Sequence, residues 1–279
     1  MATIFYNNTK RVSGGLIRMI LNRLGNKEKL SDKIISHFPK DITCFIDLFF
    51  GSGAITWAML DLFPNLYYIA NDKDNDVFNL WQVLIDSDKV NKLYEMVYYS
   101  PYHKEVYKYL TKEYIPKNEI EKAFKFLVES NYSLYGAKSN LLILAYRRAK
   151  ENLLESIKGN LEKIKYVQFI NEDFRKIRIP ITYRKNRPNQ KKGQFVYADP
   201  PYIGTKGNYD IFTENDSNDL FEKLCNSDLR FAYSEFDNPF ILEQAKQRNL
   251  NVIVLGERQN IKNRRTEILV TNYETTKSF

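Results

Sequence analysis

The sequence predicts an α/β fold in which a mostly parallel sheet ends in an antiparallel hairpin and carries a helical insert. Short apolar runs alternate with helical stretches, which favours parallel strands joined by crossing helices. Hydrophobic residues make up 43% of the 279 residues and aromatic residues 14%, enough for a large packed core. No uncharged apolar stretch approaches the roughly 18 residues that a membrane-spanning helix needs, and the N-terminus has no apolar signal core. We therefore expect a soluble, intracellular protein.

The first elements are expected near the N-terminus. Apolar residues at helical spacing predict a helix over 14–24, with Gly25 after it. The apolar run 42–48 predicts a strand, followed by a glycine turn and a helix to about residue 63. Residues 66–71 predict a second strand, which ends at Asp72.

The remaining strands are expected only after a long helical stretch. Between about 80 and 160 the chain is rich in Tyr, Lys, Glu and Leu, with helical patterns at 119–130 and 147–158. We therefore predict a core formed by 1–79 and 161–279, with a helical insert over 80–160. Strand-like runs in the second part of the core lie at 166–170, 195–198, 230–234, 251–255 and 266–272. The last two are joined by a short polar connection, which is typical of an antiparallel hairpin.

Positive charge is concentrated in one segment. The net charge is +8, and residues 175–193 hold eight Lys or Arg and no acid, so the rest of the chain is balanced. A segment of this kind is either a solvated loop or an arm that contacts nucleic-acid phosphates. The two cysteines, Cys44 and Cys225, exclude a disulfide scaffold and suit a reducing compartment.

A glycine motif follows the first predicted strand. In Asp47-Leu48-Phe49-Phe50-Gly51-Ser52-Gly53 the two glycines allow a sharp turn and a close approach of a ligand to the backbone. Asp72 follows the next strand, where an acid can accept hydrogen bonds from ribose hydroxyls. The pattern differs from the dinucleotide fingerprint, because Thr56 stands at the third glycine position. The alternative is an ordinary turn with a surface acid.

A diproline motif, Asp199-Pro200-Pro201-Tyr202, follows the strand-like run 195–198. Two consecutive prolines cannot continue a strand, because neither donates a hydrogen bond and both fix φ. The resulting stiff turn presents a carboxylate, carbonyl groups and an aromatic ring. This set suits a planar amine, which needs acceptors for its N–H groups and a face to stack on.

Together these two motifs resemble the S-adenosylmethionine-dependent amino-methyltransferases, and the chain is similar to the Dam-type adenine-N6 DNA methyltransferases. Segment 171–174 resembles that family's Asp-Phe element, and 131–136 resembles a signature of its target-recognition insert. The strand 267–273 matches the usual end of the fold. The resemblance covers about residues 40–273 and implies a Rossmann-like methyltransferase sheet.

The resemblance assigns residues to S-adenosylmethionine. It implies that Asp72 holds the ribose and that Asp173 with Phe174 holds the adenine. Family members carry an aromatic residue and Gly-Gly-Lys before the first helix; Tyr6 and Lys10 keep the spacing without the glycines, and Gly14-Gly15 lack the lysine. We expect Tyr6 and Lys10 to contact the cofactor, with a surface role as the alternative. The methionine end is expected to lie against Asp47, Phe49, Gly51 and Gly53.

The implied reaction is methyl transfer to the N6 amine of an adenine flipped out of duplex DNA. The exocyclic amine is a poor nucleophile, so alignment and charge placement matter more than a strong base. We expect Asp199 and the Pro200 carbonyl to accept the amine hydrogens, Pro201 to stiffen the turn and Tyr202 to stack on the base. No metal is expected, since His37 and His103 do not form a ligand set.

The basic segment joins the strand of the expected cofactor-adenine site to the catalytic strand, so we expect both of its ends to lie near the substrate cleft and its side chains to contact DNA. In the insert, amide and basic side chains are candidates for base or phosphate contacts, although Tyr135 could instead pack the insert's own core. The candidate DNA-binding residues are Asn131, Tyr135, Lys138, Asn140, Arg184, Lys185, Arg187, Lys191 and Lys192.

Several alternatives remain open from the sequence. A methyltransferase acting on RNA adenine would share both motifs, and so would an inactive DNA-binding regulator on the same scaffold. A cytosine amine is less favoured, because the resemblance associates Ser rather than Asp with that substrate. The recognition sequence and a companion restriction endonuclease are not determined. The resemblance implies a monomer that binds double-stranded DNA. The sequence itself indicates no membrane partner and a cytoplasmic location, at the nucleoid through DNA, or a host cytoplasm if the source is viral.

Overall fold

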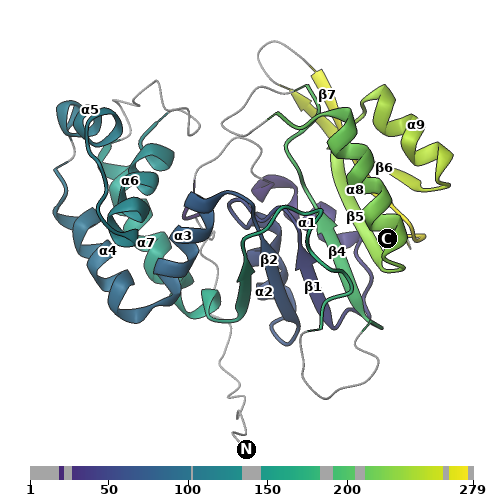
Figure 1. The fold of residues 1–279 in the computed structure, drawn as a ribbon, viewed down its shortest axis with the longest axis horizontal. Coiled ribbons are helices and arrows are strands. Elements are labelled where there is room, and N and C mark those ends of the chain that lie inside the picture. Colours follow the sequence, from purple (N-terminus) through teal and green to yellow (C-terminus); the bar gives the residue numbers. More distant parts are fainter. Residues whose placement is uncertain are drawn as a thin grey trace, which may run out of the picture.

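The structure is a computed structural model and describes residues 19–21, 27–101, 103–133, 146–182, 191–204, 211–259 and 264–275. Seven strands form one sheet in the order β3-β2-β1-β4-β5-β7-β6 (Figure 1). The strands are β1 (Cys44–Asp47), β2 (Tyr67–Asn71), β3 (Val167–Ile170), β4 (Gln194–Ala198), β5 (Arg230–Phe236), β6 (Asn251–Gln259) and β7 (Arg264–Thr271). Each lies at a position that the apolar runs predict.

The sheet is parallel except at its C-terminal side. Strands β1 to β5 pair in parallel, whereas β7 lies between β5 and β6 and is antiparallel to both. The chain builds β1, β2 and β3 in one direction and then returns to the other side of β1 for β4 and β5. The order therefore reverses between β1 and β4, which is where open α/β sheets bind ligands. The prediction of a Rossmann-like sheet with a terminal antiparallel pair is confirmed.

Helices cover both faces of the sheet. One face packs apolar residues of α1 and α2, and the other face packs residues of α8 and α9. The helices are α1 (Ser31–Ser36), preceded by the 3₁₀ turn η1 (Glu28–Leu30), α2 (Ala54–Leu62), α3 (Asn75–Ile85), α4 (Ser87–Tyr99), α5 (Lys104–Lys112), α6 (Glu119–Asn131), α7 (Tyr146–Ile164), α8 (Glu214–Asn226) and α9 (Pro239–Gln247). Within the described ranges, no helix has the length and apolar character needed to cross a membrane.

Helices α3 to α7 lie between β2 and β3 in the chain and gather at one end of the molecule (Figure 1). Their apolar residues belong to the same hydrophobic cluster as α1, α2 and one face of the sheet. The aromatic rings of Phe50, Trp57, Trp81 and Phe169 join the two parts, with neighbouring centroids 5.2 to 5.8 Å apart. The division into a core and an insert over 80–160 stays a prediction.

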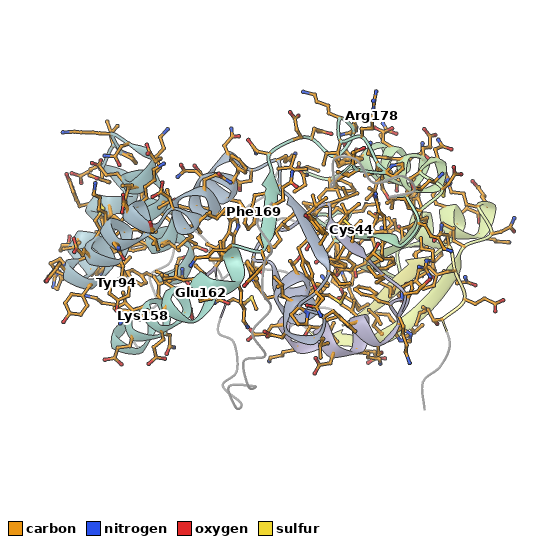
Figure 2. The ribbon with its side chains drawn as sticks, turned by 90° about the horizontal axis from the view of Figure 1, so that it is seen from below. Cys44, Tyr94, Lys158, Glu162, Phe169 and Arg178 are labelled. Atoms are coloured by element: carbon orange, nitrogen blue, oxygen red, sulfur yellow. The ribbon has the colours of Figure 1, made fainter. Side chains whose placement is uncertain are left out.

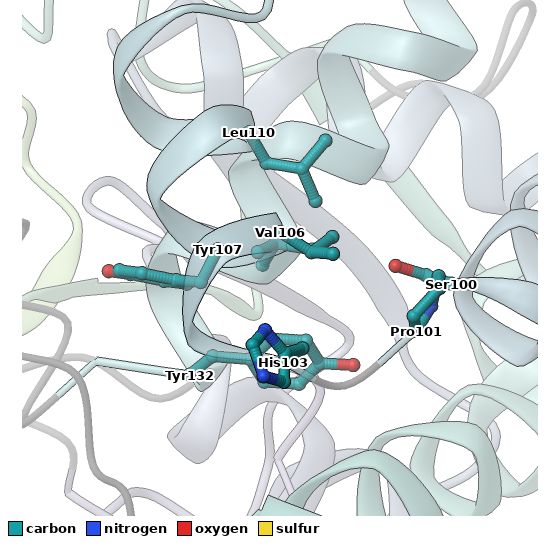
Figure 3. Close-up of a pocket in the computed structure, with 8 residues that line it drawn as sticks. Ser100, Pro101, His103, Val106, Tyr107, Leu110 and Tyr132 are labelled. Atoms are coloured by element: carbon teal, nitrogen blue, oxygen red, sulfur yellow. The ribbon is translucent and has the colours of Figure 1, made fainter.

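A pocket within these helices has a volume of about 10 Å³, room for roughly one water molecule. Tyr107 and Leu110 of α5 line it together with Tyr132, which follows α6 (Figure 3). It is formed by α5, α6 and the segment before α5, none of which belongs to the sheet. The pocket is therefore a packing defect of the helical layer and has no bearing on the site described below.

The predicted helix over 14–24 falls mostly outside the described residues. Its described part, residues 19–21, is not helical, so the prediction is wrong there. Ile20 and Leu21 are nevertheless fully buried. These two of the apolar residues that suggested a helix are therefore core residues in a described part that is not helical.

Candidate active site

The two main motifs meet at the point where the strand order reverses. Asp47 is the last residue of β1, and Asp199 follows the neighbouring strand β4. The register pairs Asp47 with Tyr197, so Asp199 lies two residues beyond it at the same edge. The carboxyl edge of β1 and β4 therefore brings together residues that are 152 positions apart.

Asp47 is a buried acid that supports the turn after β1. Its side chain is 2% exposed and accepts hydrogen bonds from the Thr56 hydroxyl, at 2.7 Å, and from the Phe49 backbone N–H, at 3.3 Å. Burial raises the pKa of Asp47 to about 7, although the Thr56 hydrogen bond opposes the shift. Thr56, which distinguishes this turn from the dinucleotide fingerprint, therefore anchors the motif.

Both glycines of the turn adopt left-handed conformations but for different reasons. Gly51 has φ +50° and Gly53 φ +76°. A Cβ at Gly53 would lie 2.5 Å from both the Phe50 ring and the Trp57 indole nitrogen, whereas a Cβ at Gly51 meets no atom within 4 Å. Gly53 is therefore required by packing, and Gly51 borders open space in which a ligand can approach the backbone.

Asp72 and Asn71 tie the ends of neighbouring strands together. Asp72 accepts the Gly51 N–H at 2.7 Å and the Asp74 N–H at 2.9 Å, one on each carboxylate oxygen. The buried Asn71 amide donates to the Leu48 and Glu172 carbonyls, both at 3.0 Å. The acid predicted to hold a ribose therefore also fixes the glycine turn.

The predicted Asp-Phe element lies beside this turn. Phe174 is buried, and its ring centroid lies 5.4 Å from that of Phe49 and 6.2 Å from that of Phe212. Asp173 is partly exposed and pairs with Arg175 at 3.3 Å. The three phenylalanines form an aromatic cluster that reaches from the turn after β1 to the segment before α8.

Asp199, whose side chain is 18% exposed, forms an ion pair with a buried lysine that the sequence analysis did not identify. The Lys27 Nζ lies 2.8 Å from an Asp199 oxygen and 3.2 Å from an oxygen of Glu267 on β7. Lys27 is 3% exposed and Glu267 1%. Burial raises the pKa of Asp199, while the Lys27 charge opposes the shift and the Glu267 charge adds to it.

Tyr202 is enclosed rather than presented to solvent. It is 8% exposed, its hydroxyl donates to Glu267, and its ring packs edge-on against Phe236 with centroids 4.5 Å apart. The Lys27 Nζ lies 4.5 Å from the ring centroid. The predicted stacking of Tyr202 on a base therefore requires Lys27 to move, and it stays a prediction.

A second buried acid holds the residue after Tyr202. Glu235 on β5 is 1% exposed and accepts the backbone N–H of Ile203 at 2.8 Å. Burial raises the pKa of Glu235 to about 8. The diproline turn is thus fixed by one acid from β5 and one from β7.

Sequence reasoning missed Lys27, Glu235 and Glu267. A signal for Lys27 was present: Gly25-Asn26-Lys27 stands directly before the first described helical turn and differs from the expected Gly-Gly-Lys at one position. The two glutamates carried no signal, because a single acid in a strand usually faces solvent. Tyr6 and Lys10, the residues chosen in its place, lie outside the described residues.

The C-terminal end of the basic segment contradicts the expectation that both ends lie near the cleft. Lys191 and Lys192 precede β4 and lie at its amino end, whereas Asp199 follows its carboxyl end, roughly 20 Å away. Lys191 also pairs with Asp228 at 2.7 Å. Arg178, labelled in Figure 2, lies in the α/β part of the molecule, far from Tyr94 and Lys158 in the helices. Arg184, Lys185 and Arg187 lie outside the described residues.

The predicted contacts in the insert are described at one position only. The Asn131 amide donates to the carbonyls of Ile20, at 2.9 Å, and Leu127, at 3.1 Å. Both of its hydrogens are thus used within the protein, which does not favour the predicted base contact. Tyr135, Lys138 and Asn140 lie outside the described residues.

Comparison with known proteins agrees with the motifs. Residues 24–270 match the family described as D12 class N6 adenine-specific DNA methyltransferase. The modification methylase StsI of Streptococcus sanguinis is 26% identical over 302 aligned residues, covering 96% of this chain and 45% of the relative. This chain therefore spans about half the length of that curated relative. The family match begins at Leu24, so it includes Lys27 but neither Tyr6 nor Lys10.

Solved structures show more distant likenesses. The N-terminal domain of human METTL16 in complex with SAH is 11% identical, with a TM-score of 0.38 over 91% of this chain and 71% of that one. The precorrin-6y C5,15-methyltransferase of Geobacter metallireducens GS-15 is 10% identical, with a TM-score of 0.38 over 89% of each chain. The family assignment comes from the sequence match, which covers most of the chain. The chain belongs to the D12 class of N6 adenine-specific DNA methyltransferases.

Proposed function

We propose that this chain transfers a methyl group from S-adenosylmethionine to the N6 amine of an adenine flipped out of duplex DNA. One observation carries the proposal: the Asp199 carboxylate and the glycine turn after Asp47 lie side by side at the carboxyl edge of β1 and β4. A methyl acceptor and a nucleoside-containing donor must meet at one point. The reversal of strand order provides that point.

The residues around the glycine turn fit S-adenosylmethionine. The open space at Gly51 allows a ligand to contact the backbone, and the Asp72 carboxylate lies beside it, where it accepts the Gly51 N–H. The cluster of Phe49, Phe174 and Phe212 offers apolar surface for an adenine ring. When bound, this group supplies a methyl on a positively charged sulfonium, which needs no metal to be reactive.

Asp199 would act on the target amine. Its carboxylate and the Pro200 carbonyl would accept the two amine hydrogens, which turns the nitrogen lone pair out of conjugation and toward the methyl group. Pro201 stiffens the turn, and Glu235 fixes its far end through the Ile203 N–H. The adenine must leave the duplex to reach this depth, at a cost of a few kcal/mol.

We further propose partners for the chain from its resemblance to the family. The segment 80–160 would contact the duplex around the target, and the protein would act as a cytoplasmic monomer. Light scattering of the purified chain tests the monomeric state. A companion restriction endonuclease would cut the same sequence only when it is unmethylated, which digestion of modified and unmodified DNA would reveal.

The test is methyl transfer from radiolabelled S-adenosylmethionine to mixed-sequence duplex DNA, followed by nucleoside digestion and mass spectrometry. Asp199→Asn removes the charge while keeping the shape, and Asp76→Asn, exposed on α3, is the matched control. We expect N6-methyladenine from the wild type and the control and none from Asp199→Asn. RNA is assayed in the same way. Label in RNA but not in DNA would show that the substrate is RNA adenine, and label in neither would contradict the proposed activity.

A further inference from the structure

Lys27 occupies two places that the proposed reaction needs. Its ammonium lies 2.8 Å from the Asp199 oxygen Oδ1, which the target amine would use as an acceptor. The same ammonium lies 4.5 Å from the centroid of the Tyr202 ring, on which the base is expected to stack. An adenine can therefore reach its proposed position only if the ammonium moves away.

The ammonium cannot simply lose its partner, because Lys27 is only 3% exposed. A buried charge without a counter-charge is strongly unfavourable. Its displacement from Asp199 therefore needs a second anion within reach, and Glu267 provides one at 3.2 Å.

The sheet fixes the position of Glu267. It is 1% exposed and pairs across β5 and β7 with Phe236, the residue that packs against Tyr202. Its oxygen Oε1 both faces Lys27 and accepts the Tyr202 hydroxyl. One glutamate thus fixes the position of the aromatic ring and attracts the cation that lies over it.

We infer that Glu267 is a positioning residue that receives the Lys27 ammonium when the target amine takes its place at Asp199. The inference rests on the proposed function, since it assigns a role to Glu267 in that reaction. In the base-free protein the ammonium is shared between the two carboxylates. With the base in place it belongs to Glu267, and Asp199 is available to the amine.

The charges around Asp199 determine in which direction each variant shifts the pH profile of the methylation rate. The groups that face it are Lys27 before η1, Glu267 on β7, Glu235 on β5, Asp47 on β1, and Tyr197, Tyr202 and Tyr233. Glu267→Gln removes a negative neighbour and so lowers the pKa of Asp199, which moves the acidic limb of the rate profile to lower pH. Lys27→Met removes a positive neighbour and moves that limb to higher pH.

The experiment compares Glu267→Gln, Lys27→Met and the double variant with wild type, using mixed-sequence duplex DNA and radiolabelled S-adenosylmethionine. Glu257→Gln, exposed on the adjacent strand β6, is the matched control. S-adenosylhomocysteine binding and thermal unfolding report on the cofactor site and the fold. We expect Glu267→Gln to lower kcat about 10- to 100-fold, because Lys27 then stays on Asp199, with S-adenosylhomocysteine affinity unchanged within about twofold.

The double variant separates this role from a structural one. If Lys27 competes with the amine, the double variant has a higher kcat at pH 8 than Glu267→Gln alone. If both residues are merely structural, the two losses of kcat add and the double variant is slower. The inference is overturned if Glu267→Gln matches the control, if the double variant is as slow as Glu267→Gln or slower, or if Glu267→Gln loses S-adenosylhomocysteine binding. A wild type that methylates no adenine in DNA overturns the proposed function as well, so the two failures are distinguishable.

Discussion

The two glycines of the turn after β1 allow a prediction in which stability and ligand binding separate. Gly51→Ala and Gly53→Ala each place a Cβ at positive φ, which costs about 1–2 kcal/mol. At Gly53 the new carbon also overlaps the Phe50 ring and the Trp57 indole at 2.5 Å, whereas at Gly51 it enters open space. Overpacking of this kind costs about 1–3 kcal/mol more.

The overlap at Gly53 cannot be relieved cheaply. Phe50 and Trp57 pack against Trp81 and Phe169, so moving either ring disturbs the contact between the sheet and the insert helices. At about 2–4 °C per kcal/mol, we expect Gly53→Ala to unfold about 2–12 °C below Gly51→Ala. Relative to its drop in unfolding temperature, Gly51→Ala should lose more S-adenosylhomocysteine affinity than Gly53→Ala, because its Cβ fills the space in which the ligand is proposed to bind.

Differential scanning calorimetry and isothermal titration with S-adenosylhomocysteine measure both quantities on the same protein samples. Equal unfolding temperatures for the two variants would refute the packing argument. Unchanged affinity in Gly51→Ala would refute the assignment of the open space to a ligand.

Two further predictions concern the buried Asp47 carboxyl group and the two lysines at the amino edge of the sheet. Because burial raises the pKa of Asp47 to about 7, the folded protein holds a proton there that the unfolded chain releases above about pH 4, so this contribution to stability is lost as the pH rises from about 4 through 7. Asp47→Asn should flatten the fall in unfolding temperature between about pH 4 and 7, and parallel profiles of variant and wild type would contradict this. The double variant Lys191→Ala/Lys192→Ala removes charges at the amino edge of the sheet, away from Asp199. We expect its DNA affinity and the salt dependence of that affinity to stay unchanged in fluorescence anisotropy titrations. A salt slope reduced by about 0.9 per lost contact would show that DNA reaches this edge.

The fold and half of the site could be predicted from local patterns. Apolar runs mark the strands because parallel strands are buried on both faces, and β1 and β4 are buried at every position. Asp47, the glycines and Asp199 follow those strands directly, so their place at the carboxyl edge could be predicted from chain order. The hairpin of β6 and β7 was similarly visible as two apolar runs with a short connection.

The rest of the site depends on contacts between distant parts of the chain. Lys27 contacts Asp199, 172 positions away in the sequence. The sequence around Lys27 has no apolar pattern that predicts burial of its charge. The basic segment was misplaced for a geometric reason. It leaves β3 at the carboxyl edge but must enter β4 at the amino edge, since the two strands are parallel in one sheet, so it has to cross a face of the sheet before it ends. Nearness in sequence to a catalytic strand does not imply nearness to the site.

Asp72 shows how a binding residue and a structural residue can be the same group. Each of its oxygens already accepts one backbone N–H, from Gly51 and from Asp74. A carboxylate has about four acceptor positions, so these two backbone bonds do not by themselves prevent it from accepting a ribose hydroxyl. The geometry of the glycine turn is then set by the same charge that would receive the cofactor. Ligand binding at Asp72 would therefore need no reorganisation of the turn, because the turn is already in the conformation that exposes Gly51.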